Sequence, residues 1–163
     1  MSNIPTYERP IADITVEEIM AMEAGPELDY LVARYMPGKW QVEFRDYYHG
    51  YTDAVLVNKG AGDLGWCPSE DANDALVVWR ALPEHDERGA AILWRIDRLM
   101  GGDPAICVAG TACDWDGWRD IGDNDSADFC LAVCRAYLWA MTQWGVPGEQ
   151  GAHGGRDGCN YQS

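Results

Sequence analysis

The stretch EEIMAMEAGPELDYLVARYM occupies residues 17–36 and carries the clearest local signals in the chain. Just before it, Thr15 forms a T-x-x-E capping box with Glu18, in which each side chain satisfies a backbone N–H of the first helical turn. Gly25 and Pro26 then close one short helix and open another, because glycine suits the position after a helix and proline suits the first turn. The sequence therefore predicts two consecutive helices.

An apolar stripe marks the second of these helices. Its members follow the spacing i, i+3, i+4, i+7, which places them on one face of a helix. They are Leu28, Leu31, Val32 and Tyr35. We expect this face to be buried, and Pro37 and Gly38 to end the helix.

Three further helices are predicted downstream. Residues 68–82 begin with Ser69 as an N-cap and with acidic residues in the first turn, where the helix dipole favours negative charge. Residues 84–100 repeat apolar side chains at helical spacing, and residues 126–144 do the same over a longer run. The repeating positions are Ile92, Ile96 and Leu99 in the first run, and Phe129, Val133, Ala136, Tyr137, Ala140 and Trp144 in the second.

Alternating apolar and polar residues predict strands between these helices. Trp40, Val42 and Phe44 alternate with polar neighbours, and residues 54–57 form a second short apolar run. Residues 105–113 are apolar and β-branched, and residues 115–121 can return antiparallel to them as a hairpin. Helices and antiparallel strands together indicate an α+β fold.

Length and composition favour one domain. A chain of 163 residues falls in the common single-domain range. We expect an extended N-terminal arm over residues 1–14, which contain Pro5 and Pro10. The folded domain is expected over residues 15–144, and residues 145–163 have the glycine-rich composition of a flexible tail.

The net charge of −15 argues against direct binding to nucleic acid or to an anionic membrane, because like charges repel. The first residues lack a secretory signal, and no apolar run is long enough to span a membrane. The six cysteines are therefore expected to be free thiols in the cytoplasm, mostly as small core residues. Cys130 and Cys134 lie one helical turn apart but lack a metal-binding motif.

Three segments resemble the phage ABA sandwich domain family. They are EEIMAMEAGPELDYLVARYM at 17–36, PSEDANDALVVWRAL at 68–82 and ADFCLAVCRAYLWAM at 127–141. The resemblance implies a small, mainly antiparallel sheet sandwiched between helices, in α/β/α layers. It also implies a bacteriophage origin and the cytoplasm of an infected bacterium, and it brings no catalytic motif. Residues 37–67 and 84–100 look like insertions relative to the family. We expect any function that is specific to this chain to depend on them.

Three groups of side chains are candidates for ligand binding. The cluster Tyr47, Tyr48, His49 and Tyr51 suits a recognition surface, because tyrosine offers contact area at low entropic cost. Trp115 and Trp118 flank an Asp-Gly turn and suit stacking on a planar ligand. Arg135 suits contact with an anion, joined by Arg80, Arg95 or Arg98. The structural alternatives are half-buried strand ends, packing over the sheet, and an ion pair between Arg135 and a carboxylate.

No cofactor, metal site or catalytic residue is expected. The aspartates between residues 114 and 128 have no register that supplies both the glycine and the glutamate of a calcium loop. The three histidines, His49, His85 and His153, lie in no nucleophile motif.

The sequence therefore predicts a non-enzymatic bacteriophage accessory protein. We expect it to bind a host protein or to sequester a small nucleotide-like signal, in an anti-defence role. An acidic DNA mimic that inhibits a host DNA-binding protein is the alternative. A small hydrolytic enzyme is a third reading, and it requires His49 or His85 beside a carboxylate. A homodimer through the Trp-rich helices is also compatible with the sequence.

Overall fold

The computed structural model describes residues 3–38, 41–46, 52–56, 64–99, 105–114, 117–126 and 128–144, and the tail predicted at 145–163 lies outside these ranges. Two short 3-10 turns precede four α-helices and six strands within the described residues. The elements, in chain order, are η1 (Thr6–Glu8), η2 (Ile11–Asp13), α1 (Val16–Ala21), α2 (Pro26–Tyr35), β1 (Val42–Asp46), β2 (Thr52–Leu56), β3 (Leu64–Gly65), α3 (Ala72–Arg80), β4 (Ala91–Leu99), β5 (Ala105–Asp114), β6 (Gly117–Ser126) and α4 (Phe129–Trp144).

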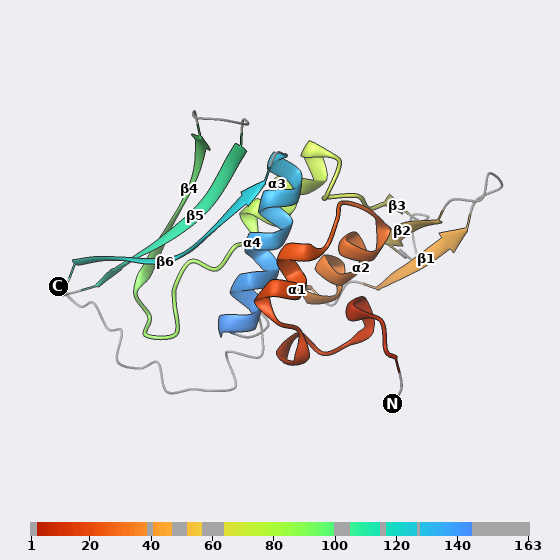
Figure 1. The fold of residues 1–163 in the computed structure, drawn as a ribbon, viewed down its shortest axis with the longest axis horizontal. Coiled ribbons are helices and arrows are strands. Elements are labelled where there is room, and N and C mark those ends of the chain that lie inside the picture. The colour runs from red at the N-terminus through yellow and green to blue at the C-terminus, as the bar shows by residue number, and fades with distance from the viewer. Residues whose placement is uncertain are drawn as a thin grey trace.

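The strands form two antiparallel sheets, with orders β1-β2-β3 and β4-β5-β6. The helices lie between the two sheets (Figure 1). Helix α4 packs on β5 and β6, whereas α2 packs on β1 and β2. The predicted α+β class and the antiparallel pairing are confirmed. The layers differ from the single sheet between helices that the family resemblance implies, because the described strands form two sheets with the helices between them (Figure 1).

The prediction of a helix over residues 84–100 is wrong, because this segment contributes a strand to the second sheet. Ala91–Leu99 is strand β4, paired with β5 from Ala91 opposite Cys113 to Leu99 opposite Ala105. The helical spacing of Ile92 and Ile96 also fits an alternating strand, because both lie on the same side of a chain with period two. Pairing with β5 decides between the two periods, since strand formation depends on neighbours far along the chain.

The predicted hairpin is confirmed and is longer than expected. Strands β5 and β6 pair from Asp114 opposite Gly117 to Ile106 opposite Ser126, with an irregularity at Gly110 and Thr111. Because Ser126 belongs to β6, the final helix begins at Phe129 and not at the predicted residue 126.

Helices α1 and α2 form as the sequence predicts. The Thr15 hydroxyl accepts from the Glu18 N–H at 3.1 Å, and the Glu18 carboxylate accepts from the Thr15 N–H at 2.9 Å. Gly25 caps α2 with φ of 152°, and Pro26 is its first residue. The stripe residues are buried, with Leu28, Leu31 and Val32 at 0% exposure and Tyr35 at 8%.

Helix α3 starts later than predicted. Its N-cap is Asp71, whose carboxylate accepts from the N–H groups of Asn73 and Asp74 at 2.8 and 3.2 Å. Ser69 is therefore not the cap, and the prediction at this residue is wrong. Asp71 is the better cap because its carboxylate is charged and faces the positive end of the helix dipole.

Helix α4 lies at the centre of the core and contacts α1, α2 and α3 as well as the sheet of β5 and β6. Val133, Ala136, Tyr137 and Ala140 are buried as predicted. The Tyr137 hydroxyl donates to the Tyr35 carbonyl at 2.6 Å, which joins α4 to the end of α2. None of the described helices combines the length and the apolar character that crossing a bilayer requires.

The N-terminal residues pack on this core. Ile11 and Ile14 are buried, and the Ile11 N–H donates to the Tyr35 hydroxyl at 2.8 Å. Arg34 of α2 donates to the carbonyls of Tyr7 and Arg9, the latter at 3.1 Å. These bonds fix η1 and η2 against α2.

Candidate functional site

Most of the aromatic residues predicted as binding groups lie outside the described residues. This holds for Tyr47, Tyr48, His49, Tyr51 and Trp115. Trp118 has a described backbone on β6 opposite Cys113, and its side chain lies outside the description. Binding by these residues stays a prediction.

Arg135 does not pair with a described carboxylate. Its guanidinium donates from Nη2 to the Met22 carbonyl at 2.7 Å, and its buried Nε has no hydrogen-bond partner among the described residues. Burial lowers the pKa of this guanidinium. Within the described residues, the Met22 carbonyl at the end of α1 accepts from the guanidinium where the structural alternative expected a carboxylate. This bond joins α4 to the connection between α1 and α2.

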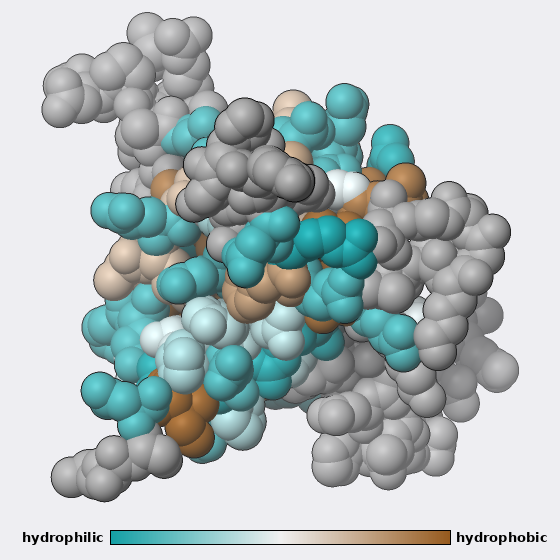
Figure 2. All heavy atoms as spheres, turned by 90° about the vertical axis from the view of Figure 1, so that its right-hand side faces the viewer, coloured by the Kyte–Doolittle hydropathy of each residue, from teal (hydrophilic) through white to brown (hydrophobic). Residues whose placement is uncertain are grey.

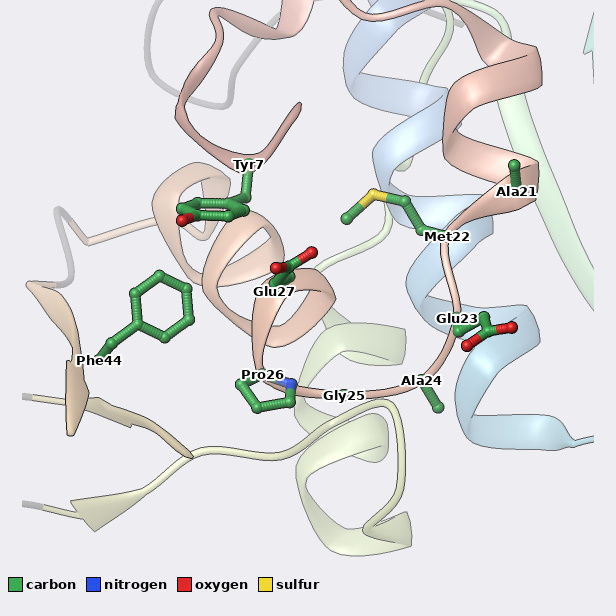
Figure 3. Close-up of a pocket in the computed structure, with 9 residues that line it drawn as sticks. All are labelled: Tyr7, Ala21, Met22, Glu23, Ala24, Gly25, Pro26, Glu27 and Phe44. Atoms are coloured by element: carbon green, nitrogen blue, oxygen red, sulfur yellow. The ribbon is translucent and has the colours of Figure 1, made fainter. Parts of the chain in front are cut away.

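That connection forms one wall of a pocket with a volume of about 770 Å³. Side chains of η1, the α1–α2 connection and β1 surround it (Figure 3). The lining residues are Tyr7, Ala21, Met22, Glu23, Ala24, Gly25, Pro26, Glu27 and Phe44. The pocket thus combines segments far apart in the sequence.

Three aromatic rings build the wall opposite the connection. The Tyr30 and Phe44 rings stack with centroids 4.5 Å apart and an angle of 11°. The Tyr7 ring meets both edge-on, with centroids 5.6 Å from Tyr30 and 5.1 Å from Phe44. Such stacked and T-shaped pairs favour fixed ring positions, so Tyr7 and Phe44 offer a stiff apolar surface to the pocket.

Among the described residues, the charged groups of the lining are both acidic. Glu27 projects between the Tyr7 ring and the Met22 side chain, and Glu23 lies farther along the connection (Figure 3). Both glutamates are exposed, and neither forms a hydrogen bond or an ion pair with another described residue. Burial raises the pKa of the Tyr7 hydroxyl, and the negative charges of Glu8 and Glu27 raise it further. The described lining therefore carries two negative charges.

A buried carboxylate supports the pocket wall at Gly25. The Gly25 N–H donates to the Ser69 hydroxyl at 2.9 Å, and the Ser69 N–H donates to the Asp29 carboxylate at 2.8 Å. Trp66 donates from Nε1 to the Asp29 carbonyl at 2.9 Å. Asp29 is 2% exposed, and burial raises its pKa to about 7. This chain of bonds fixes the start of α2 beside the pocket.

Two thiols of the described residues, Cys67 and Cys130, are not activated as nucleophiles. Burial, and then the charge of Asp74, raise the pKa of Cys67 to about 11, and burial with Asp128 does the same for Cys130. Thiolates are the reactive form, so these thiols stay inert at neutral pH. His85 is exposed beside β4 and does not line the pocket, and His49 lies outside the described residues. Within the described ranges, no group of three His, Cys, Asp or Glu side chains is placed to hold a metal ion.

None of the lining residues was predicted as a binding group, and Arg135, which was, contacts the pocket wall through the Met22 carbonyl but does not line the pocket. Tyr7 lies in the segment expected as an arm, and Phe44 was interpreted only as a strand residue. A usable signal was the pair of glutamates at 23 and 27, which flank the Gly25–Pro26 break and so lie at the junction of two helices.

Comparison of the chain with models of protein families, with characterised proteins and with solved structures gives no match. The likeness to the phage ABA sandwich family therefore stays a prediction from the sequence.

Proposed function

We propose that this chain is a non-enzymatic bacteriophage accessory protein that binds a host protein through the pocket between η1, β1 and the α1–α2 connection. The observation that carries the proposal is the composition of this pocket. Two aromatic rings, a thioether and two glutamates without described partners surround about 770 Å³. Pockets of this size with apolar walls and a few polar groups are typical of binding sites.

The charge of the pocket favours a protein over a nucleotide-like signal. A nucleotide needs cationic or N–H donor groups around its phosphates, whereas the charged residues that line the pocket in the described part of the chain are both glutamates. Arg135, the cation predicted for such a ligand, is engaged with the Met22 carbonyl. We therefore propose capture of a host protein as the role and set sequestration of a nucleotide aside.

The described surface near β1 to β3 suits a partner protein that contacts only a small area. Figure 2 shows the face at the right-hand side of Figure 1, where hydrophilic side chains dominate the described part and hydrophobic ones form small separate areas. Broad obligate interfaces are apolar at their core, whereas transient ones resemble the rest of the surface. A partner that inserts a side chain into one pocket fits such a face.

Site-specific photo-cross-linking in bacterial cells tests this proposal. A photoreactive amino acid replaces Glu23 at the pocket, and in a control it replaces Leu76, which is 41% exposed on α3 and does not line the pocket. We expect a discrete adduct with one bacterial protein only from position 23. The substitution Met22→Trp, which fills the pocket, should abolish the adduct, whereas Leu76→Trp should not.

Other outcomes would contradict the proposal. Equal adducts from positions 23 and 76, or an adduct from position 23 that survives Met22→Trp, would show that the pocket is not the contact site. A DNA mimic would bind its target through carboxylates spread over the surface, and filling one pocket would leave that binding unchanged.

A further inference from the structure

We infer that the pocket receives an arginine side chain that the bound protein presents on an exposed segment. The inference rests on the proposed function, since it names the chemistry of the partner at the same site. Glu27 is the main residue of the proposed arginine site. This carboxylate projects into the pocket between the Tyr7 ring and Met22 (Figure 3), and it has no described partner.

The charges of the lining favour a cation over an anion. Glu23 and Glu27 both line the pocket, and no lysine, arginine or histidine within the described residues does. Burial raises the pKa of the Tyr7 hydroxyl, and the charges of Glu8 and Glu27 raise it further, so these carboxylates also act on the aromatic wall. A ligand with a positive group gains in this field, whereas an anion is repelled.

The aromatic wall favours a planar cation with an apolar stem. Tyr7 and Phe44 line the pocket and are held at fixed positions by Tyr30. Guanidinium groups stack on aromatic rings and also pair with carboxylates through two parallel N–H donors. The ammonium of lysine is a compact point charge and does neither of these as well.

The remaining lining fits the rest of such a ligand. The Met22 side chain points toward Tyr7 across the pocket (Figure 3), and Pro26 adds a second apolar surface. Methionine adapts its shape to apolar groups, so it can pack on the methylene stem. A volume of about 770 Å³ is large enough for one arginine with its flanking residues.

Nuclear magnetic resonance titration of the full chain tests the inference with three peptides. Acetyl-Gly-Arg-Gly-amide is compared with the same peptide containing citrulline, which has the shape of arginine without its charge, and with the lysine peptide. The observed signal is the Met22 methyl group. We expect saturable shifts with the arginine peptide and binding weaker by about three- to fivefold with the other two, the ratio typical of one partly exposed charge and ring contact.

Three single substitutions test whether the preference for the arginine peptide depends on the glutamates of the pocket. Glu27→Gln should remove the preference for arginine over citrulline, and Glu23→Gln should reduce it less. Glu17→Gln changes the same charge on the exposed side of α1, outside the pocket, and should leave the preference intact.

Equal binding of the arginine and citrulline peptides, equal binding of the lysine peptide, or no saturable shift at Met22 would overturn the inference. These results are distinct from failure of the proposed function, which the cross-linking experiment decides. An adduct at position 23 together with equal peptide binding would keep the pocket as the contact site and reject arginine as its occupant.

Discussion

The two sides of α4 are held together in different ways. On the side of α1 and α2, Ile19, Leu28 and Leu31 are fully buried, and the connection between the helices is fixed by Arg135 and Ser69 from distant parts of the chain. On the other side, β4 pairs with β5, the Arg95 guanidinium donates to the Thr111 hydroxyl at 3.2 Å, and Leu93 and Ile96 are 52% and 47% exposed. The pocket wall therefore lies on the side of the fully buried leucines, away from the exposed apolar residues of β4.

The largest expected contrast is between leucines on the two sides. Leu31→Ala should lower the free energy of unfolding by about 2–5 kcal/mol, because it leaves a cavity beneath α2. Leu93→Ala should change it by less than about 1 kcal/mol, because this side chain is largely solvated. Urea unfolding of both variants measures the difference. Equal losses would mean that β4 is packed more tightly than its exposure indicates.

The buried Asp29 should make the helical side sensitive to pH. Its pKa is raised from 3.8 to about 7 by burial, so the folded state keeps a proton that the unfolded state has lost. Stability should therefore fall as pH rises from about 4 to about 7 and then level off. At about 1.4 kcal/mol for each tenfold change in proton affinity, the loss is on the order of 4 kcal/mol.

Asp29→Asn isolates this effect. The asparagine oxygen can still accept from the Ser69 N–H, but the side chain has no charge to bury. Relative to the parent, this variant should gain stability between pH 4 and pH 8 in urea unfolding. Asp13→Asn, at an exposed carboxylate of η2, serves as control. A difference in the free energy of unfolding between the parent and Asp29→Asn that stays constant with pH would contradict the raised pKa of Asp29.

A smaller effect is expected at the start of α1. Thr15→Ala removes one bond of the capping box and should cost about 1 kcal/mol, which thermal unfolding detects. The comparison is Asp71→Ala at the cap of α3, where two N–H bonds to one carboxylate are lost. We expect at least as large a loss there. No change in either variant would mean that packing alone holds these helix starts.

The smallest expected change in stability is at Arg135. Arg135→Met breaks the bond to the Met22 carbonyl, which is worth about 1 kcal/mol, but also removes the unpartnered Nε from the interior. The two terms offset each other, so unfolding should shift by less than about 1 kcal/mol. The Met22 methyl signal should broaden or move nonetheless, because the connection loses its anchor. A large loss of stability with an unchanged Met22 signal would contradict this role.

The sequence predicted the parts of the fold that depend on near neighbours. The capping box at Thr15 and the break at Gly25 and Pro26 are local signals, and both are confirmed. Strand β4 was mistaken for a helix because Ile92 and Ile96 fit both periods and only the pairing with β5 separates them. Tertiary contacts of this kind are not encoded in spacing.

The pocket could not be predicted from the sequence because tertiary contacts bring its residues together. Tyr7, Met22 and Phe44 come from three segments, and α2 packs on the first sheet beside them. Arg135 was recognised as exceptional because it is a cation on an apolar helix, but its partner is a backbone carbonyl, which carries no residue-type signal. The predicted aromatic groups at 47–51 and 115 lie outside the described residues, so binding there stays a prediction.

Calorimetric titration of the partner recovered by cross-linking against two variants tests the central claim most directly. Met22→Trp fills the pocket, whereas Leu76→Trp adds the same ring to the exposed face of α3. We predict that Met22→Trp raises the dissociation constant at least about tenfold, as expected for blocking a contact at the centre of an interface, while Leu76→Trp leaves it unchanged. Equal dissociation constants for the two variants would contradict the assignment of the pocket as the binding site.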